Sequence, residues 1–220
     1  MTESQVTPTS TPVPTWMIVL MDRSGSMDAI WDDTVGGFNT LVKEQQKVPG
    51  EAKLMLGSFD DKYEEIFPLQ PLADVPELKE QIFPRNSTAL FDAIARVIFA
   101  VSEKLMEIPD NKDWPVPHLT IFTDGRENSS KEYGGPAGLS KIRSIIELKR
   151  SQGWVIEFRS CDEEAIQTGT SLGLPRGVIF VFPRTGEGMA SSMGQTSRSF
   201  TQTRTGGRSS SSGSGGKKPN

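Results

Sequence analysis

Short apolar runs alternate along this chain with longer segments whose apolar residues recur at helical spacing. A strand buried on both faces of a sheet has a nearly continuous apolar sequence, and parallel strands need a crossover connection, usually a helix. The alternation therefore predicts an α/β fold, with a mostly parallel open sheet of about six strands and helices on both faces. We expect strands at residues 16–21, 52–59, 64–72, 118–123, 154–160 and 178–182, and helices at 27–48, 88–106, 139–151, 163–172 and 187–203.

Prolines and glycines add detail to this pattern. Pro68 and Pro71 have no N–H to donate, so the strand at 64–72 is expected at the sheet edge, in a hairpin with the strand before it. Gly36 and Gly37 weaken the first helix relative to alanine, and close packing of that helix is the expected reason for them.

The helix at 187–203 is mostly polar, with one narrow apolar face. Met189, Met193, Thr196 and Phe200 follow one another at spacings of 4, 3 and 4 residues. So thin an apolar stripe predicts that this helix packs weakly on the rest of the domain. Weak packing is expected of a helix that moves between two positions, and equally of a marginally stable terminal helix.

Composition divides the chain into a domain with two tails. Residues 1–15 are Thr- and Pro-rich and read as a disordered leader, 16–203 form one domain, and the Gly- and Ser-rich residues 204–220 read as a disordered tail. The chain has 24 Lys and Arg against 28 Asp and Glu, a net charge of −4. The charge is uneven, because residues 16–183 carry −8 and residues 184–220 carry +5. An acidic body does not favour a general nucleic-acid-binding surface.

Two residue counts exclude whole classes of chemistry. A single cysteine, Cys161, cannot form an internal disulfide, and a single histidine, His118, cannot build a His-based zinc site. His118 begins a buried strand, so we interpret it as a packed residue, and Cys161 is read as a small buried hydrophobe. No apolar run approaches the ~20 residues that a membrane helix needs. We therefore expect a cytoplasmic protein that does not bind membranes.

Oxygen-bearing side chains follow the first buried strand. Asp22-Arg23-Ser24-Gly25-Ser26 lies between that strand and the first helix, where open α/β sheets form their ligand crevice. One carboxylate and two hydroxyls suit a hard cation such as Mg²⁺. By itself the segment is better explained as a helix cap.

Two further segments favour a cation site over a simple helix cap. Asp124-Gly125 follows another buried strand, and Ser87-Thr88 precedes the most apolar helix. If the two strands are neighbours, Asp22 and Asp124 place two like charges in one crevice, which is costly unless a cation lies between them. Thr88 has a simpler explanation as an N-cap.

Together these segments resemble the von Willebrand factor A domains that carry a metal-ion-dependent adhesion site. That family has Asp-x-Ser-x-Ser after the first strand, a Thr in a later loop and an Asp before Gly after the fourth strand. The matching positions here are Asp22, Ser24, Ser26, Thr88 and Asp124. The resemblance covers residues 16–203, and FPRNSTALFDAI and IFTDGREN are similar to compact bacterial and phage-type members. One departure is Asn86, which stands where many relatives have glycine.

The resemblance implies strand order 3-2-1-4-5-6 and a divalent cation, Mg²⁺ or else Mn²⁺ or Ca²⁺. Ser24, Ser26 and Thr88 would bind it through neutral hydroxyls, and Asp22 and Asp124 would bind directly or through water. An open position would accept an Asp or Glu of a protein partner, with an AAA+ ATPase-linked complex as one implied setting. The residues expected to contact the partner are Arg23, Asn86, Arg126 and Glu127.

Two other functions compete with metal-dependent binding. A hydrolase or phosphatase could use the same carboxylates and hydroxyls, but Ser24 stands where a phosphatase of the haloacid dehalogenase type would need a second Asp. The one Gly-x-Ser-x-Gly match, at residues 169–173, lies at the end of the helix expected at 163–172 and not at the strand-to-helix turn that a nucleophile elbow needs, and no Gly-x-x-x-x-Gly-Lys-Ser/Thr phosphate-binding loop is present. The basic tail, with Arg198, Arg204 and Arg208, could attract nucleic acid nonspecifically, but it has little aromatic content for base stacking. We therefore expect a binding module that is not an enzyme and has no specific nucleic-acid partner.

Overall fold

A single six-stranded sheet organises the computed structural model, which describes residues 12–79, 84, 87–124, 127–162 and 164–206. The strands are β1 (Thr15–Asp22), β2 (Ala52–Phe59), β3 (Tyr63–Pro71), β4 (Val116–Thr123), β5 (Val155–Ser160) and β6 (Ile179–Val181). Their order is β3-β2-β1-β4-β5-β6, and every pair is parallel except β2 with β3. The predicted fold class and strand order are confirmed.

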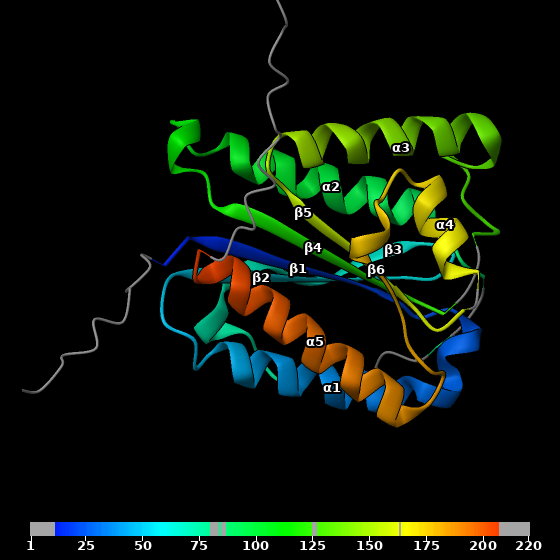
Figure 1. Cartoon of the computed structure of the whole chain (residues 1–220), viewed down its shortest axis with the longest axis horizontal. Helices are drawn as coiled ribbons and strands as arrows, with labels where there is room; N and C mark the ends of the chain where they lie inside the picture. Colours follow the sequence, from blue (N-terminus) through cyan, green and yellow to red (C-terminus); the bar gives the residue numbers. More distant parts are fainter. Residues whose placement is uncertain (1–11, 80–83, 85–86, 125–126, 163, 207–220) are drawn as a thin grey trace, which may run out of the picture.

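Helices cover both faces of this sheet (Figure 1). The α-helices are α1 (Trp31–Gln45), α2 (Leu90–Met106), α3 (Gly135–Ser151), α4 (Ala165–Ser171) and α5 (Gly186–Arg204). The short 3-10 helices are η1 (Gly25–Ile30), η2 (Leu72–Asp74), η3 (Asn111–Asp113) and η4 (Arg176–Val178). Helices α1 and α5 lie side by side on one face, and α2, α3 and α4 lie on the other. None of the helices in the described ranges is both long and apolar enough to cross a membrane.

The sheet separates two apolar cores because alternate residues of a strand point to opposite faces. On β1, Ile18 and Leu20 join the core beneath α2 and α3, whereas Met17 and Val19 join the core beneath α1 and α5. All eight residues of β1 are buried, as its continuous apolar sequence predicts.

The sheet edge and the helix starts refine the sequence-based expectations. Strand β3 is the antiparallel edge strand, as its prolines predict. The first predicted helix is instead η1 followed by α1, and α3 begins at Gly135, four residues before the expected start, with a proline in its first turn. A Cβ on Gly37 would lie 2.9 Å from Cγ of Met193 on α5, whereas one on Gly36 would meet nothing within 4 Å. Close packing therefore explains Gly37 alone.

Helix α5 is held more firmly than its thin apolar stripe predicts, because buried polar groups supplement that stripe. Gln45 of α1 donates from Nε2 to the Ser197 carbonyl at 2.7 Å and to the Thr201 hydroxyl at 3.0 Å. Arg204 is 2% exposed and donates to the carbonyls of Gln45, Val48 and Gly50 at 2.7, 2.7 and 3.0 Å. The expectation of weak docking is wrong, and Arg204 belongs to the domain and not to the basic tail.

Candidate metal centre at the carboxyl edge of the sheet

Two carboxylates meet where β1 and β4 end. The strands are parallel neighbours, with Met21 paired to Phe122, so Asp22 and Asp124 lie at the same sheet edge. Both are buried, at 0% and 1% exposure. The prediction that the two strands adjoin is confirmed, and two acidic side chains share one crevice.

Asp22 is held by its own loop and by the neighbouring strand. Its Oδ1 accepts a hydrogen bond from the Ser24 backbone N–H at 2.7 Å, and its Oδ2 accepts one from the Thr123 hydroxyl at 2.5 Å. Burial raises the pKa of Asp22 to about 6, because these hydrogen bonds offset only part of the lost hydration, and the Asp124 charge adds to the rise. Sequence reasoning did not single out Thr123, although it directly precedes Asp124.

A short chain of oxygens links the two segments. The hydroxyls of Ser24 and Ser26 are 3.2 Å apart, and Ser26 donates to Oδ1 of Asp124 at 2.7 Å. Four of the five predicted ligand residues are thus linked by direct hydrogen bonds: Asp22, Ser24, Ser26 and Asp124. No three His, Cys, Asp or Glu side chains gather as a metal site within the described part of the chain, so a cation here depends on hydroxyl ligands.

An arginine that sequence reasoning missed completes the site. Arg184 donates from Nη1 to Oδ2 of Asp124 at 2.6 Å and from Nη2 to the Asp124 carbonyl at 2.7 Å. Its Nη1 also lies 3.2 Å from the Ser26 carbonyl, and its side chain is 42% exposed. Burial raises the pKa of Asp124, with Ser26 and Arg184 opposing the rise. The strand order could have pointed to Arg184, because the loop after the last parallel strand begins at the same carboxyl edge of the sheet as Asp22 and Asp124.

Thr88 lies just before α2 and is 3% exposed. Its backbone N–H donates to Oδ1 of Asn128 at 2.9 Å, and the Asn128 N–H donates to the Thr88 carbonyl at 3.0 Å. This reciprocal pair attaches Thr88 to the loop that follows Asp124. Asn128 therefore positions a predicted ligand.

Arg23 is not the partner contact expected from the sequence. It is 3% exposed, its Nε lies 3.3 Å from Oδ2 of Asp60, and its Nη1 donates to Glu64 at 2.8 Å. Buried arginine is retained where carboxylates pair with it, so Arg23 fastens the ligand loop to the β2–β3 hairpin.

Glu127 is also occupied within the chain. Its carboxylate accepts from the N–H of Phe91 at 2.9 Å, from the N–H groups of Ser129 and Ser130 at 3.0 and 2.7 Å, and from the Ser130 hydroxyl at 2.6 Å. It orders its own loop and satisfies a free N–H at the start of α2, so the expectation of a partner contact is corrected here too. Asn86 and Arg126, the other two expected contacts, lie outside the described residues.

The one cysteine follows β5 at the carboxyl edge of the sheet, and the one histidine lies near the other end of β4. Cys161 is half-buried against the core beneath α1 and α5, and burial raises the pKa of its thiol to about 11. His118 is fully buried near the opposite end of β4, with Nδ1 2.9 Å from the Thr203 hydroxyl and its ring edge-on to Phe200. Its interpretation as a packed histidine is confirmed.

Solved structures share this architecture. The chain superposes on the von Willebrand factor domain of the type V pili tip protein Mfa5 from Porphyromonas gingivalis with a TM-score of 0.64, covering 88% of this chain and 97% of that one at 9% identity. The chain has a von Willebrand factor A fold. A von Willebrand factor type A protein from Catenulispora acidiphila gives a TM-score of 0.60 at 17% identity, covering 84% of this chain and 42% of that one.

A third neighbour carries a metal. Proximal thread matrix protein 1 from the mussel byssus, in a structure with zinc in its metal-ion-dependent adhesion site, gives a TM-score of 0.61 at 14% identity, covering 88% of this chain and 47% of that one. This chain thus spans less than half the length of the Catenulispora and mussel chains. No protein-family model and no curated protein sequence matches it. The von Willebrand factor A fold of this chain therefore rests on structural similarity.

Proposed function

We propose that the carboxyl edge of the sheet binds a divalent cation, and that this cation binds an acidic residue of a protein partner. Ser24, Ser26 and Thr88 would hold the cation through hydroxyls, and Asp22 and Asp124 would hold it directly or through water. The loop before α1, the loop before α2 and the end of β4 supply these residues. The proposal thus uses the residues that the sequence resemblance singles out.

The spacing of the oxygens is the observation that carries this proposal. Adjacent ligands of an octahedral Mg²⁺, each ~2.1 Å from the ion, lie about 3.0 Å from one another. The separations here are 3.2 Å between Ser24 and Ser26 and 2.7 Å between Ser26 and Asp124. The three oxygens therefore lie as neighbouring ligands of one small hard cation would lie.

The donor types favour Mg²⁺, with Mn²⁺ and Ca²⁺ as alternatives, because all the side-chain donors are oxygens. Neutral hydroxyl ligands leave much of the positive charge of such an ion uncompensated, so the bound ion attracts a further carboxylate. Arg184 adds a second positive group at the same edge, and its exposed part can meet the same carboxylate. We assign to Arg184 the partner-binding role that the sequence suggested for Arg23.

We also propose that the site binds and does not catalyse. A serine nucleophile needs an adjacent base, and the only histidine of the chain is buried under α5, near the opposite end of β4. Adhesion-type neighbours of the same fold support this proposal. A cytoplasmic setting and a partner in an AAA+ ATPase-linked complex stay predictions.

A metal titration tests the cation site. Isothermal titration of the full chain with Mg²⁺, and with Mn²⁺ followed by electron paramagnetic resonance, should show one site in the wild type. The double variant Ser24→Ala/Ser26→Ala should lose it. Ser144→Ala/Ser151→Ala is the matched control, because these two exposed hydroxyls donate only to carbonyls of α3. Equal metal affinity in both double variants would refute the ligand assignment.

A capture experiment tests the binding function. Tagged protein is incubated with native lysate in Mg²⁺ or in EDTA, and bound proteins are identified by mass spectrometry. We expect a partner that is retained by the wild type and the control in Mg²⁺ and is lost in EDTA and in Ser24→Ala/Ser26→Ala. Partners that bind equally in all these conditions would contradict a metal-mediated contact.

A further inference from the structure

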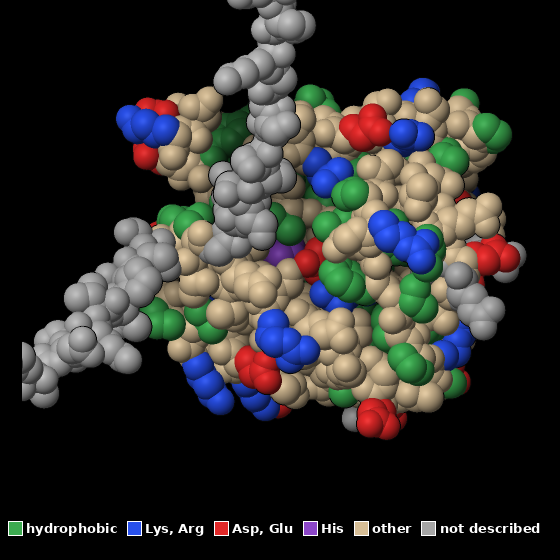
Figure 2. All heavy atoms as spheres, in the orientation of Figure 1, with side chains coloured by type: hydrophobic (Ala, Val, Ile, Leu, Met, Phe, Trp, Pro, Cys, Tyr) green, Lys and Arg blue, Asp and Glu red, His purple; other side chains and the backbone are tan. Residues whose placement is uncertain are grey.

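A groove of about 860 Å³ lies on the β6 side of α5. It is lined by α5, by β5 and β6 and by the first residues of β4, and it shares no residue with the proposed metal site. Figure 2 shows this side of the molecule, with a hollow alongside α5 that has charged side chains at its base. Its volume lies within the range of sites for small organic ligands, about 300–1,000 Å³.

A buried ion pair forms the floor of the groove. Glu157 and Arg159 are two residues apart on β5 and so point to the same face, and they are only 5% and 1% exposed. Nη2 of Arg159 donates to Oε2 of Glu157 at 2.8 Å, and the other Glu157 oxygen accepts from the Ser199 hydroxyl. Two charges buried between a helix and a sheet are costly to desolvate, so the pair depends on close hydrogen-bonded partners.

Arg159 has N–H groups that its pairing with Glu157 does not use. Its Nη1 makes a long 3.3 Å contact with Oε1 of Gln195, and its Nε is buried without a hydrogen-bond partner among the described residues. Buried polar groups in native proteins are almost always satisfied, and each exception needs a cause. An acceptor that is absent from the free protein would be such a cause.

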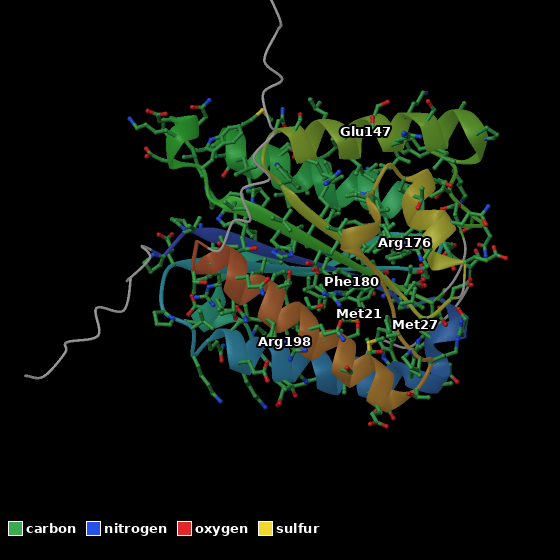
Figure 3. All side chains as sticks on the ribbon, viewed as in Figure 1. Met21, Met27, Glu147, Arg176, Phe180 and Arg198 are labelled. Atoms are coloured by element: carbon green, nitrogen blue, oxygen red, sulfur yellow. The ribbon has the colours of Figure 1, made fainter. Side chains whose placement is uncertain are left out.

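Positive charge exceeds negative charge in the groove. Its charged lining residues are Arg159 and Arg198 against Glu157, so one positive charge is uncompensated. Arg198 is exposed on α5 and Phe180 lies on β6, and both line the groove (both are labelled in Figure 3). Both arginines line the cavity, and guanidinium groups bind anionic groups such as a carboxylate or phosphate.

Part of the groove is apolar. The Phe180 ring lies against the Arg159 guanidinium, with 4.2 Å between the guanidinium carbon and the ring centroid. Val116, Val155 and Val178 line the same cavity. A bound anion would thus have an apolar body in contact with these side chains.

We propose that this groove is a binding site for a small organic carboxylate with an apolar body. The carboxylate would lie between Arg159 and Arg198, and the apolar part would lie against Phe180 and the valines. The groove does not depend on the metal-centre proposal, since it lies elsewhere on the sheet.

Protein-observed NMR on the full chain tests the site with 4-phenylbutyrate as the probe. The expected result is a set of shift changes confined to groove residues, at millimolar or lower probe concentration. The neutral amide 4-phenylbutyramide has the same apolar body and should bind at least about tenfold more weakly, as expected for loss of a charge-assisted hydrogen bond. Phenyl phosphate should compete for the same residues, whereas inorganic phosphate alone should bind more weakly because it lacks the apolar part.

Arg198→Gln provides the decisive variant, because an exposed side chain can be replaced without loss of the fold. It should weaken 4-phenylbutyrate by about tenfold. Arg176→Gln is the matched control, since Arg176 is an exposed arginine near the same sheet edge but outside the lining of the groove (Figure 3). The proposal is overturned if acid and amide bind equally, if inorganic phosphate binds as tightly as the carboxylate, or if both variants behave alike.

Discussion

Replacing Arg204 with methionine should destabilise the domain far more than a substitution near a chain end usually does. The guanidinium group is buried at 2% exposure and donates to the carbonyls of Gln45, Val48 and Gly50. It thereby joins the end of α5 to the end of α1 and to the turn before β2. Methionine retains most of the apolar contact but has no donor for these oxygens.

The expected loss follows from the three backbone carbonyls. A buried acceptor that loses its partner costs about 1 kcal/mol or more, and recovery of the desolvation energy of the guanidinium offsets part of that cost. We therefore expect the free energy of unfolding to fall by about 3 kcal/mol. For a domain of this size, that loss corresponds to a decrease in Tm of about 6–12 °C.

Urea denaturation followed by tryptophan fluorescence measures this loss, since the chain has four tryptophans. Arg198→Met is the matched control, because it makes the same substitution on an exposed position of the same helix and should change stability by no more than about 0.5 kcal/mol. Arg204→Lys should give an intermediate loss, because a single ammonium group cannot reach carbonyls on two sides. Equal midpoints for Arg204→Met and Arg198→Met would refute the reasoning.

Two further predictions concern backbone contact and protonation. Gly138→Ala should destabilise the fold strongly, because the added Cβ would lie 1.9 Å from the Tyr133 carbonyl oxygen. Gly36→Ala should instead stabilise α1 by about 0.5–1 kcal/mol, because its Cβ would meet nothing within 4 Å. Thermal melts that rank the two variants the other way would contradict this prediction. Asp22 has a pKa of about 6 in the folded chain against an ordinary 3.8, so the folded state holds a proton that the unfolded state releases. In EDTA, the free energy of unfolding should therefore fall by up to about 3 kcal/mol as pH rises from about 4 to 6. Urea titrations at the two pH values measure this difference, and Asp22→Asn should not show it.

The fold was predictable because its signals are local. Continuous apolar runs mark the buried strands, prolines mark the edge strand β3, and helical spacing marks α2 and α5. The order of the strands came from a resemblance carried by five residues, and the positions of Asp22 and Asp124 followed from parallel strands that end at one edge.

The missed residues depend on partners that are distant in sequence. Arg184 is 60 residues from Asp124, and Arg204 is 159 residues from Gln45, so no local pattern links either pair. Polar side chains on a helix also look like a solvated face, which is why the firm docking of α5 was not expected. The same ambiguity placed Arg23 among the partner contacts, although Asp60 holds it in the interior.

The two ends of the described domain have a mechanical consequence. The Val13 N–H donates to the Arg204 carbonyl at 2.8 Å, so the chain enters and leaves at one edge of the sheet, opposite the proposed metal site (Figure 1). If a partner is held at the carboxyl edge while tension is applied at residue 13, the force runs along β1, which has hydrogen-bonded neighbours on both sides. Such a load shears two ladders of hydrogen bonds at once and does not peel them apart one by one. The central strand is therefore the part of this fold best placed to transmit tension.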